Sequence, residues 1–256
     1  MTKKVIFFDI DGTLATHKGI VPSNIEALKA LRKKGHSIII SSGRPKWYVK
    51  KMFGDLIDGV ISSNGRHIEY KDKIVLDNVL TIDEINDIIQ TCNNAECGYF
   101  LAESNNVYID NREYIIDRDL NDGYQDQYIH EWDIKNLAPI YMFDIFYNND
   151  KHYQHIKEAF KDRYILNDHH EGSADASSIT FNKGNAVSYL ISNLSLTKED
   201  SYAFGDGAND IDMFHSVGVA IAMGNAIDIA KEAADYITDD ILDDGITKAL
   251  TKFNLI

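Results

Sequence analysis

The amino-acid sequence predicts an α/β fold, in which a Rossmann-like parallel sheet with helices on both faces is interrupted by an inserted α+β domain. Two observations lead to this prediction. At both ends of the chain, short apolar runs that end in polar clusters alternate with helical patterns, as in parallel sheets. Between about residues 81 and 178, helical and hairpin-like patterns occur without such clusters. We therefore expect a discontinuous core, residues 1–80 and 179–256, and an insertion, residues 81–178.

The core begins with Val5–Phe8, four consecutive apolar residues that are typical of a strand buried on both faces. This run ends at Asp9 and Asp11, which Gly12 and Thr13 follow. In open α/β sheets, ligands bind just beyond the carboxyl ends of such strands. Two neighbouring carboxylates repel each other, and a cation between them removes that cost. Oxygen ligands of this kind suit Mg²⁺, although aspartate is also a common turn residue.

A helix is expected after this strand. Pro22 suits the first turn, and Ser23 and Glu26 have the spacing of a capping box, in which side chains bind the free N–H groups of the helix start. Gly35 is typical of the residue that follows the end of a helix.

A second buried strand is predicted at Ser37–Ser41, and it ends in Ser42, Gly43, Arg44 and Pro45. Because proline suits the first position of a helix, these residues should form a strand-to-helix turn. A helix start offers free N–H groups to an anion, to which Ser42 adds a hydroxyl and Arg44 a charge. A capping Ser42 and a surface Arg44 explain the same pattern equally well.

Further strands follow on both sides of the insertion. A third short strand at residues 60–63 leads into Asn64 and a tight turn, and then into a hairpin over residues 68–76. After the insertion, Lys183 lies at the start of a helix, and a strand at residues 202–204 runs into the polar stretch 205–210.

In a parallel sheet, the polar residues that follow these strands meet at one edge. They are Asp9, Asp11, Ser42, Asn64, Asp206, Asn209 and Asp210, with Lys183 near the insertion boundary. Each alone could be a cap or a turn residue, but four acids, two amides, a hydroxyl and an amine at one edge are hard to explain in that way. The sequence therefore predicts a site for a metal and an anion there.

Composition limits the classes of protein. The 44% hydrophobic and 26% charged residues are those of a globular protein, and no apolar run has the roughly 18 residues of a membrane span. A net charge of −14 disfavours nucleic acid and anionic membranes as partners. The apolar run near Met1 ends in Asp9, unlike a signal peptide, so we expect a cytoplasmic location. Cys92 and Cys97 should be free thiols.

The order and types of these residues resemble the haloacid dehalogenase (HAD) superfamily, specifically its Cof-like, class IIB branch of phosphatases. Residues 9–14 match the first motif of that family in full. Residues 42–45 resemble the second motif with Ser where Thr is commoner, residues 183–184 the third, and residues 205–210 the fourth. Residues 219–226 are similar to the Gly-Val-Ala-Met-Gly-Asn-Ala stretch of the same branch.

The resemblance covers the whole core and implies an HAD fold with a class 2 cap as the insertion. It also implies a Mg²⁺-dependent phosphatase, a phosphoric monoester hydrolase, that acts on small phosphorylated metabolites such as sugar phosphates. The insertion contains no motif that aligns with the family, and residues 177–182 lack the proline often found there. The contacts that the insertion makes with a substrate therefore do not follow from the motifs.

The roles of four residues follow from the resemblance and from the chemistry of phosphate esters, whose hydrolysis is easier in two steps through a covalent intermediate. Asp9 is the expected nucleophile, which forms an aspartyl-phosphate. Asp11 is the expected general acid and base. Mg²⁺ is expected on Asp9, the Asp11 backbone carbonyl and Asp206, with Lys183 supplying further positive charge.

The other site residues are expected to bind phosphate or substrate. They are Ser42, Gly43, Arg44, Asn64, Lys183 and Asn209. Asp210 is expected to orient Lys183 or a metal-bound water from behind the metal ligands.

The core residues recognise only phosphate and metal, so the insertion should select the substrate. Its candidate segments are residues 124–132 and 169–178, whose polar side chains suit hydroxyl groups, although ordinary exposed loops would look the same. Two other functions stay open: a phosphomutase of the same superfamily, and a non-catalytic sensor of a phosphorylated metabolite. The expected partner is a small phosphate ester, without nucleic acid or membrane, and the sequence leaves monomer and dimer open.

Overall fold

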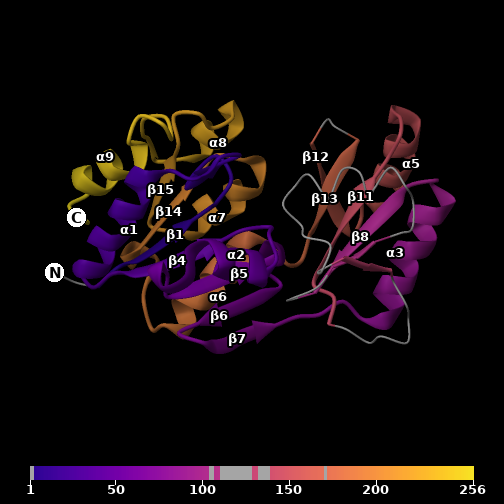
Figure 1. The fold of residues 1–256 in the computed structure, drawn as a ribbon, viewed down its shortest axis with the longest axis horizontal. Coiled ribbons are helices and arrows are strands. Elements are labelled where there is room, and N and C mark those ends of the chain that lie inside the picture. Colours follow the sequence, from indigo (N-terminus) through magenta and orange to yellow (C-terminus); the bar gives the residue numbers. More distant parts are fainter. Residues whose placement is uncertain (1–2, 104–106, 110–128, 132–138, 170–171) are drawn as a thin grey trace. The chain divides into compact units, whose positions relative to one another are not determined.

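The computed structural model describes residues 3–103, 107–109, 129–131, 139–169 and 172–256 (Figure 1). The chain divides into two compact units. Unit 1 comprises Met1–Asp77 and Phe181–Ile256, and unit 2 comprises Asn78–Thr180. Within the described ranges, no helix is both long and apolar enough to cross a membrane.

Unit 1 contains an eight-stranded sheet. In order across the sheet, its strands are β16 (Tyr236–Ile237), β15 (Val219–Ala222), β14 (Ser201–Gly205), β1 (Val5–Phe8), β4 (Ser37–Ser41), β5 (Gly59–Ser62), β6 (His67–Tyr70) and β7 (Lys73–Asp77). The strands from β16 to β5 pair in parallel, whereas β6 and β7 form an antiparallel hairpin at one edge. The predicted α/β class is confirmed, with an antiparallel edge on the otherwise parallel sheet.

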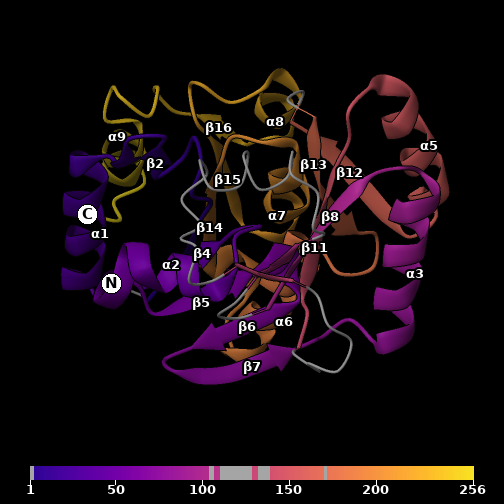
Figure 2. The same ribbon diagram turned by 45° about the vertical axis from the view of Figure 1, so that its right-hand side comes forward.

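The helices of unit 1 connect and cover these strands (Figures 1 and 2). They are α1 (Pro22–Lys33), α2 (Lys46–Phe53), α6 (Lys183–Asn193), α7 (Ile211–Ser216), α8 (Asp228–Ala233) and α9 (Gly245–Lys252), with short 3-10 turns η1 (Gly54–Leu56), η2 (Ser63–Gly65), η5 (Lys198–Asp200) and η6 (Ala208–Asp210). A small hairpin, β2 (Ala15–Thr16) and β3 (Gly19–Ile20), follows β1. Helix α1 packs on α9, and α7 packs on both α6 and α8.

The central strand is β1, which lies between β14 and β4 and is fully buried. Phe8 is in register with Phe204 of β14 and Ile40 of β4. The rings of Phe8 and Phe204 stack with their centroids 4.9 Å apart. Because these strands are parallel, the residues that follow each of them emerge at the same edge of the sheet.

Helix α1 begins differently from the prediction. Its N-cap is Val21, Pro22 is its first residue, and no side chain caps the helix start. The predicted capping box of Ser23 and Glu26 is therefore wrong. Proline at the first position has no N–H to be capped and its fixed φ starts the helix, so Ser23 already lies inside the first turn. The helix ends before Gly35, as predicted, and Gly35 has a φ of 83°.

Unit 2 contains a six-stranded sheet of order β10-β9-β8-β11-β13-β12. Its strands are β8 (Gly98–Ala102), β9 (Val107–Ile109), β10 (Ile129–Glu131), β11 (Met142–Phe146), β12 (Tyr164–Asp168) and β13 (Ser173–Ser178), and its helices include α3 (Ile82–Asn94) and α5 (Asp150–Phe160). The strands pair antiparallel except for β9 and β10. Cys92 and Cys97 are buried in its core and do not form a disulfide with each other, as expected.

Candidate active site

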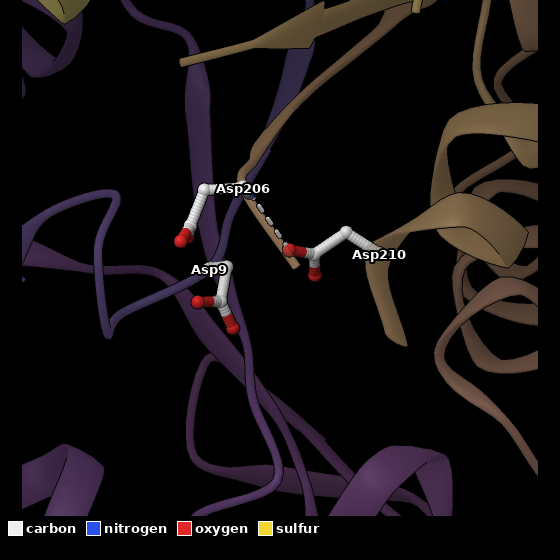
Figure 3. Close-up of side chains that lie close together, drawn as sticks. All are labelled: Asp9, Asp206 and Asp210. Atoms are coloured by element: carbon white, nitrogen blue, oxygen red, sulfur yellow. Dashed lines mark hydrogen bonds between the residues drawn. The ribbon is translucent and has the colours of Figure 1, made fainter. Parts of the chain in front are cut away.

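The site is built where β1 and β14 end. Asp9 follows β1 directly, and its N–H donates to the Phe204 carbonyl over 3.0 Å. Asp206 follows β14, and Asp210 lies at the end of η6 in the same loop. Carboxylate oxygens of Asp9, Asp206 and Asp210 all lie within 4.8 Å of one another, and Figure 3 shows the three side chains close together. Residues almost 200 positions apart thus form one acidic cluster, as the parallel strand order predicts.

Lys183, the first residue of α6, supplies the positive charge of this cluster. Its side chain is only 1% exposed, and its Nζ donates to Asp9 Oδ1 over 2.6 Å and to Asp210 Oδ1 over 2.7 Å. Burial alone would lower the pKa of Lys183, but Asp210 and Asp9 outweigh that effect and raise it above its ordinary value. The ammonium is therefore held charged in the interior by two carboxylates.

Asp210 uses both of its carboxylate oxygens on protein donors. Oδ1 accepts from Lys183, and Oδ2 accepts from the backbone N–H groups of Asp206 and Gly207, each over 3.0 Å. Asp210 is fully buried. Although it belongs to the acidic cluster, its bonds fit a residue that orients Lys183 and the loop better than one that binds a metal directly.

A hydrogen bond from the loop after β1 holds the side chain of Asp206 in place. Thr13 Oγ1 donates to Asp206 Oδ1 over 2.8 Å. Gly12 lies in the same loop after β1 and has a φ of 81°. A Cβ at this position would lie 2.2 Å from Asp206 Oδ2. Only glycine fits both the backbone conformation and this close approach.

The cluster carries more negative than positive charge. Burial and the nearby charge of Asp210 raise the pKa of Asp9, against the attraction of Lys183. Burial and Asp210 likewise raise the pKa of Asp206 to about 6, against the hydrogen bond from Thr13. Three carboxylates that face one ammonium would be relieved by a further cation.

The oxygen donors at this edge fit Mg²⁺. Asp9 and Asp206 offer carboxylate oxygens, and the Asp11 carbonyl accepts no hydrogen bond within the described part of the chain. Mg²⁺ binds to a few carboxylates and carbonyls and keeps sites for water and phosphate. The residues present therefore fit the expected ion.

Asp11 lies outside the buried cluster. Its carboxylate is 56% exposed and pairs with Arg44, which donates from Nε to Oδ2 over 3.1 Å and from Nη2 to Oδ1 over 3.4 Å. The guanidinium of Arg44 also lies 5.0 Å from the centre of the Tyr48 ring. The first and second motifs therefore meet through a bidentate ion pair that the sequence did not predict.

The second motif also meets Asn64. Ser42 is buried, its Oγ accepts from the Arg44 N–H over 3.1 Å, and its carbonyl accepts from the Asn64 N–H over 3.2 Å. A Cβ on Gly43 would lie 3.2 Å from Asn64 Oδ1. Asn209 is half-buried on η6, between Asp206 and Asp210 in sequence.

Three residues that shape the site were not predicted from the sequence. Thr13 was noted only as part of a motif, and its bond to Asp206 depends on the loop backbone. Asn24 resembles an ordinary helix residue, yet it is fully buried and donates from Nδ2 to the carbonyls of Thr13 and Leu14. Asn225 was visible as part of a motif-like stretch, without an assigned role.

The candidate specificity segments of the insertion are described in part. In residues 124–132, residues 124–128 and 132 lie outside the described residues, and residues 129–131 form β10. In residues 169–178, residues 170–171 lie outside them. The described remainder consists of His169, Gly172 and β13.

Comparison with known proteins identifies the class. Residues 6–250 match the model of the haloacid dehalogenase-like hydrolases, so the chain belongs to this family. It is 30% identical to YkrA of Bacillus subtilis, a proposed phosphatase, over 100% of both chains. It is 29% identical to the 5-amino-6-(5-phospho-D-ribitylamino)uracil phosphatase YcsE of the same organism, over 96% of this chain and 94% of that one.

Solved structures agree. A HAD subclass IIB sugar phosphatase superposes with a TM-score of 0.83 and 26% identity, over 99% of this chain and 100% of that one. A protein of Geobacillus kaustophilus superposes over 100% of both chains, with a TM-score of 0.86 and 26% identity. The resemblance to HAD phosphatases and the enzyme class, phosphoric monoester hydrolase, are thereby confirmed.

Proposed function

We propose that the chain is a Mg²⁺-dependent phosphatase that hydrolyses small phosphorylated metabolites, such as sugar phosphates, through an aspartyl-phosphate on Asp9. The observation that carries this proposal is the buried Asp9, whose Oδ1 is fixed by Lys183 at 2.6 Å beside two further carboxylates. A nucleophile held in one position loses little freedom on reaching the transition state.

In the first proposed step, a carboxylate oxygen of Asp9 forms a bond to phosphorus. The ester P–O bond breaks, and the leaving oxygen takes a proton from Asp11. In the second step, water loses a proton to Asp11 and attacks phosphorus, so that phosphate leaves and Asp9 is restored. The half-exposed carboxylate of Asp11 is suited to this exchange because it lies at the surface beside the buried cluster.

Asp9, the Asp11 carbonyl and Asp206 would hold Mg²⁺, which when bound neutralises charge on the carboxylates and the phosphate. Lys183 adds positive charge through its contact with Asp9, and Asp210 keeps Lys183 in place. With the positive charge of Mg²⁺ and Lys183 in place, the anionic oxygens of a phosphate would be attracted to the site.

The remaining residues are proposed to bind phosphate or substrate. Ser42 and Asn209 would donate to phosphate oxygens, and Gly43 and Asn64 would line the same position. Two contacts support this role for Ser42 and Asn64. The Ser42 carbonyl accepts a hydrogen bond from the Asn64 N–H, and η2, which contains Asn64, packs on α6, the helix that begins at Lys183. Arg44 is proposed to orient Asp11 until a substrate binds.

The inserted domain, residues 81–178, is proposed to act as the cap that selects the substrate. Relatives with this family's fold include a sugar phosphatase and a phosphatase of a ribitylaminouracil phosphate, which supports a polyhydroxylated phosphate ester as substrate class. The described part of the second candidate segment contains polar side chains that suit hydroxyl groups.

The test is a screen of the full-length protein against sugar phosphates, nucleotides, pyridoxal phosphate and p-nitrophenyl phosphate, with Mg²⁺ and with a chelator. We expect hydrolysis that stops on chelation and returns with added Mg²⁺. Full activity after exhaustive chelation would refute the metal site. A requirement for a sugar bisphosphate activator would indicate a phosphomutase, and binding without turnover would indicate a sensor.

A further inference from the structure

The turn at residues 224–226 follows β15 and takes no part in the proposed chemistry. Its flanking backbone is bound to the end of β14, which carries a proposed metal ligand. The Met223 N–H donates to the Gly205 carbonyl and the Ile227 N–H donates to the Asp206 carbonyl, each over 3.0 Å. The turn is therefore fastened to one of the two strand ends that form the site.

Asn225 connects this turn to the other strand end. Its Nδ2 donates to the Gly12 carbonyl over 2.8 Å, and its Oδ1 accepts from the Ile241 N–H over 3.0 Å. The side chain is exposed and makes these two bonds with backbone groups only. Asn225 thus joins the loop after β1 to two segments from the C-terminal part of the chain.

The bond to Gly12 restricts the loop residue with the greatest freedom. The Gly12 N–H donates to the Ala15 carbonyl over 2.9 Å. Because a peptide is planar and trans, fixing that N–H also directs the Asp11 carbonyl of the same peptide to the opposite side. Asn225 fixes the following peptide through its oxygen, so both peptides around Gly12 are held.

Two proposed metal ligands depend on this geometry. The carbonyls of residues 12–15 each accept a protein hydrogen bond, whereas that of Asp11 accepts none in the described part of the chain. Thr13, whose N atom belongs to the peptide held by Asn225, donates its hydroxyl to Asp206. A loose Gly12 would therefore disturb both the Asp11 carbonyl and the Asp206 carboxylate.

We propose that Asn225 is a positioning residue of the metal site, which orients the Asp11 carbonyl and Asp206 by holding the Gly12 carbonyl. This inference rests on the proposed function, because it concerns the Mg²⁺ site described there. Asn225 touches neither substrate nor metal, and it acts through Gly12 and Thr13.

The test is calorimetric titration of the metal-free, full-length protein with MgCl2. Asn225→Ala removes both side-chain hydrogen bonds, and the one that holds the Gly12 carbonyl is of ordinary strength, so we expect Mg²⁺ to bind about three- to tenfold more weakly than to the wild type. The matched control is Asn149→Ala in unit 2, where Asn149 caps α5 by accepting from the His152 N–H over 3.0 Å. The control should bind Mg²⁺ as the wild type does.

Two further measurements separate positioning from a general loss of structure. Hydrogen exchange without metal should be faster in Asn225→Ala for the peptide that covers residues 9–16, and unchanged in unit 2. With p-nitrophenyl phosphate, saturating Mg²⁺ should restore kcat while KM stays constant, whereas a merely structural defect would lower kcat at every Mg²⁺ concentration.

Equal Mg²⁺ affinities of Asn225→Ala and the wild type would overturn the proposal. If the wild type itself bound no Mg²⁺, the metal site of the proposed function would be wrong instead, so the two failures are distinguishable. If Asn225→Ala did not fold, Asn225→Ser would replace it. Failure of both to fold would also contradict the proposal, because an exposed positioning residue should not be needed for folding.

Discussion

The polar clusters of the two units differ in how they are held. In unit 1, Lys183 is 1% exposed and binds Asp9 and Asp210, which come from distant parts of the chain. In unit 2, His169 and Asp175 pair over 3.0 Å while their side chains are 49% and 19% exposed. The first cluster is fixed by the fold of the whole unit, and the second by neighbours within ten residues.

The second cluster extends along β12 and β13. Asn167 donates from Nδ2 to Asp175 Oδ2 over 3.0 Å and to Ser177 Oγ over 3.1 Å. Local and partly solvated contacts of this kind tolerate substitution, whereas a buried charged cluster does not. The contrast teaches that the proposed chemistry depends on a buried cluster in which substitution is strongly destabilising, whereas the proposed specificity surface consists of contacts in which substitution is tolerated.

The largest expected effect is the loss of turnover in Asp9→Asn. The amide cannot form an acyl phosphate, so steady-state hydrolysis of p-nitrophenyl phosphate should fall below detection. Circular dichroism should show an intact fold, because the amide is isosteric with the carboxylate. A rate near that of the wild type would show that Asp9 is not the nucleophile.

Asp11→Asn should have the next largest effect. It retains the proposed nucleophile but removes proton transfer, which typically contributes about 10²–10⁴-fold to the rate. Measured kcat should fall by about that factor with a sugar phosphate, and by less with p-nitrophenyl phosphate, whose leaving group needs little protonation. An equal fall with both esters would argue against Asp11 as the general acid.

Lys183→Met tests the buried cluster through stability. Removing one partner of a buried charged network typically costs about 3–5 kcal/mol of unfolding free energy. Urea denaturation at neutral pH should record a loss of this size. Lys161→Met is the matched control, since Lys161 forms an exposed pair with Glu158, and it should leave the curve unchanged.

The pH dependence of the metal effect follows from Asp206. Its pKa lies at about 6 in the folded protein, above the ordinary 3.8, so the metal-free fold binds this proton more tightly than the unfolded chain does. The contribution of Asp206 to the free energy of unfolding is therefore present at low pH, and it is lost as the pH rises between about 4 and 6. The raised pKa of Asp9 acts in the same direction.

Mg²⁺ needs the ionised carboxylates and should reverse this loss. The rise in Tm on adding Mg²⁺ should consequently be larger at pH 7.5 than at pH 5, by differential scanning fluorimetry. A rise in Tm that is the same at both pH values would contradict the assignment of Asp206 as a ligand.

The smallest expected effect concerns unit 2. Asp175→Asn should leave Mg²⁺ affinity and p-nitrophenyl phosphate hydrolysis within about twofold of the wild type, because Asp175 lies in unit 2 and the proposed metal site consists of residues of unit 1. It should change the ranking of sugar phosphates by kcat/KM. An unchanged ranking would show that this cluster does not take part in substrate selection.

The acidic cluster of unit 1 could be predicted because few arrangements of the strands are compatible with its sequence. A buried apolar run such as Val5–Phe8 specifies a central parallel strand, and the parallel order then brings Asp9 and Asp206 to the same edge. Periodicity and the strand-end rule thus suffice for the acidic cluster. The hairpin of β6 and β7 was predicted from a different signal, two short apolar runs separated by a polar turn.

The sequence did not allow us to predict which side chains of the site bind to one another. The pair of Arg44 with Asp11 and the bond from Thr13 to Asp206 depend on rotamers and loop conformations that no sequence period encodes. The capping box at Ser23 failed because a proline starts α1 one residue earlier. Side-chain hydrogen bonds of this kind become visible only when the backbone is placed.

The most direct test of the account is to trap the covalent intermediate. A ³²P-labelled phosphate ester that proves to be a substrate is mixed with the full-length protein and Mg²⁺, quenched in acid within milliseconds, and digested. The account predicts label on the peptide that contains Asp9, released by hydroxylamine as expected of an acyl phosphate, and absent from Asp9→Asn. Turnover without such label, or label on another residue, would contradict it.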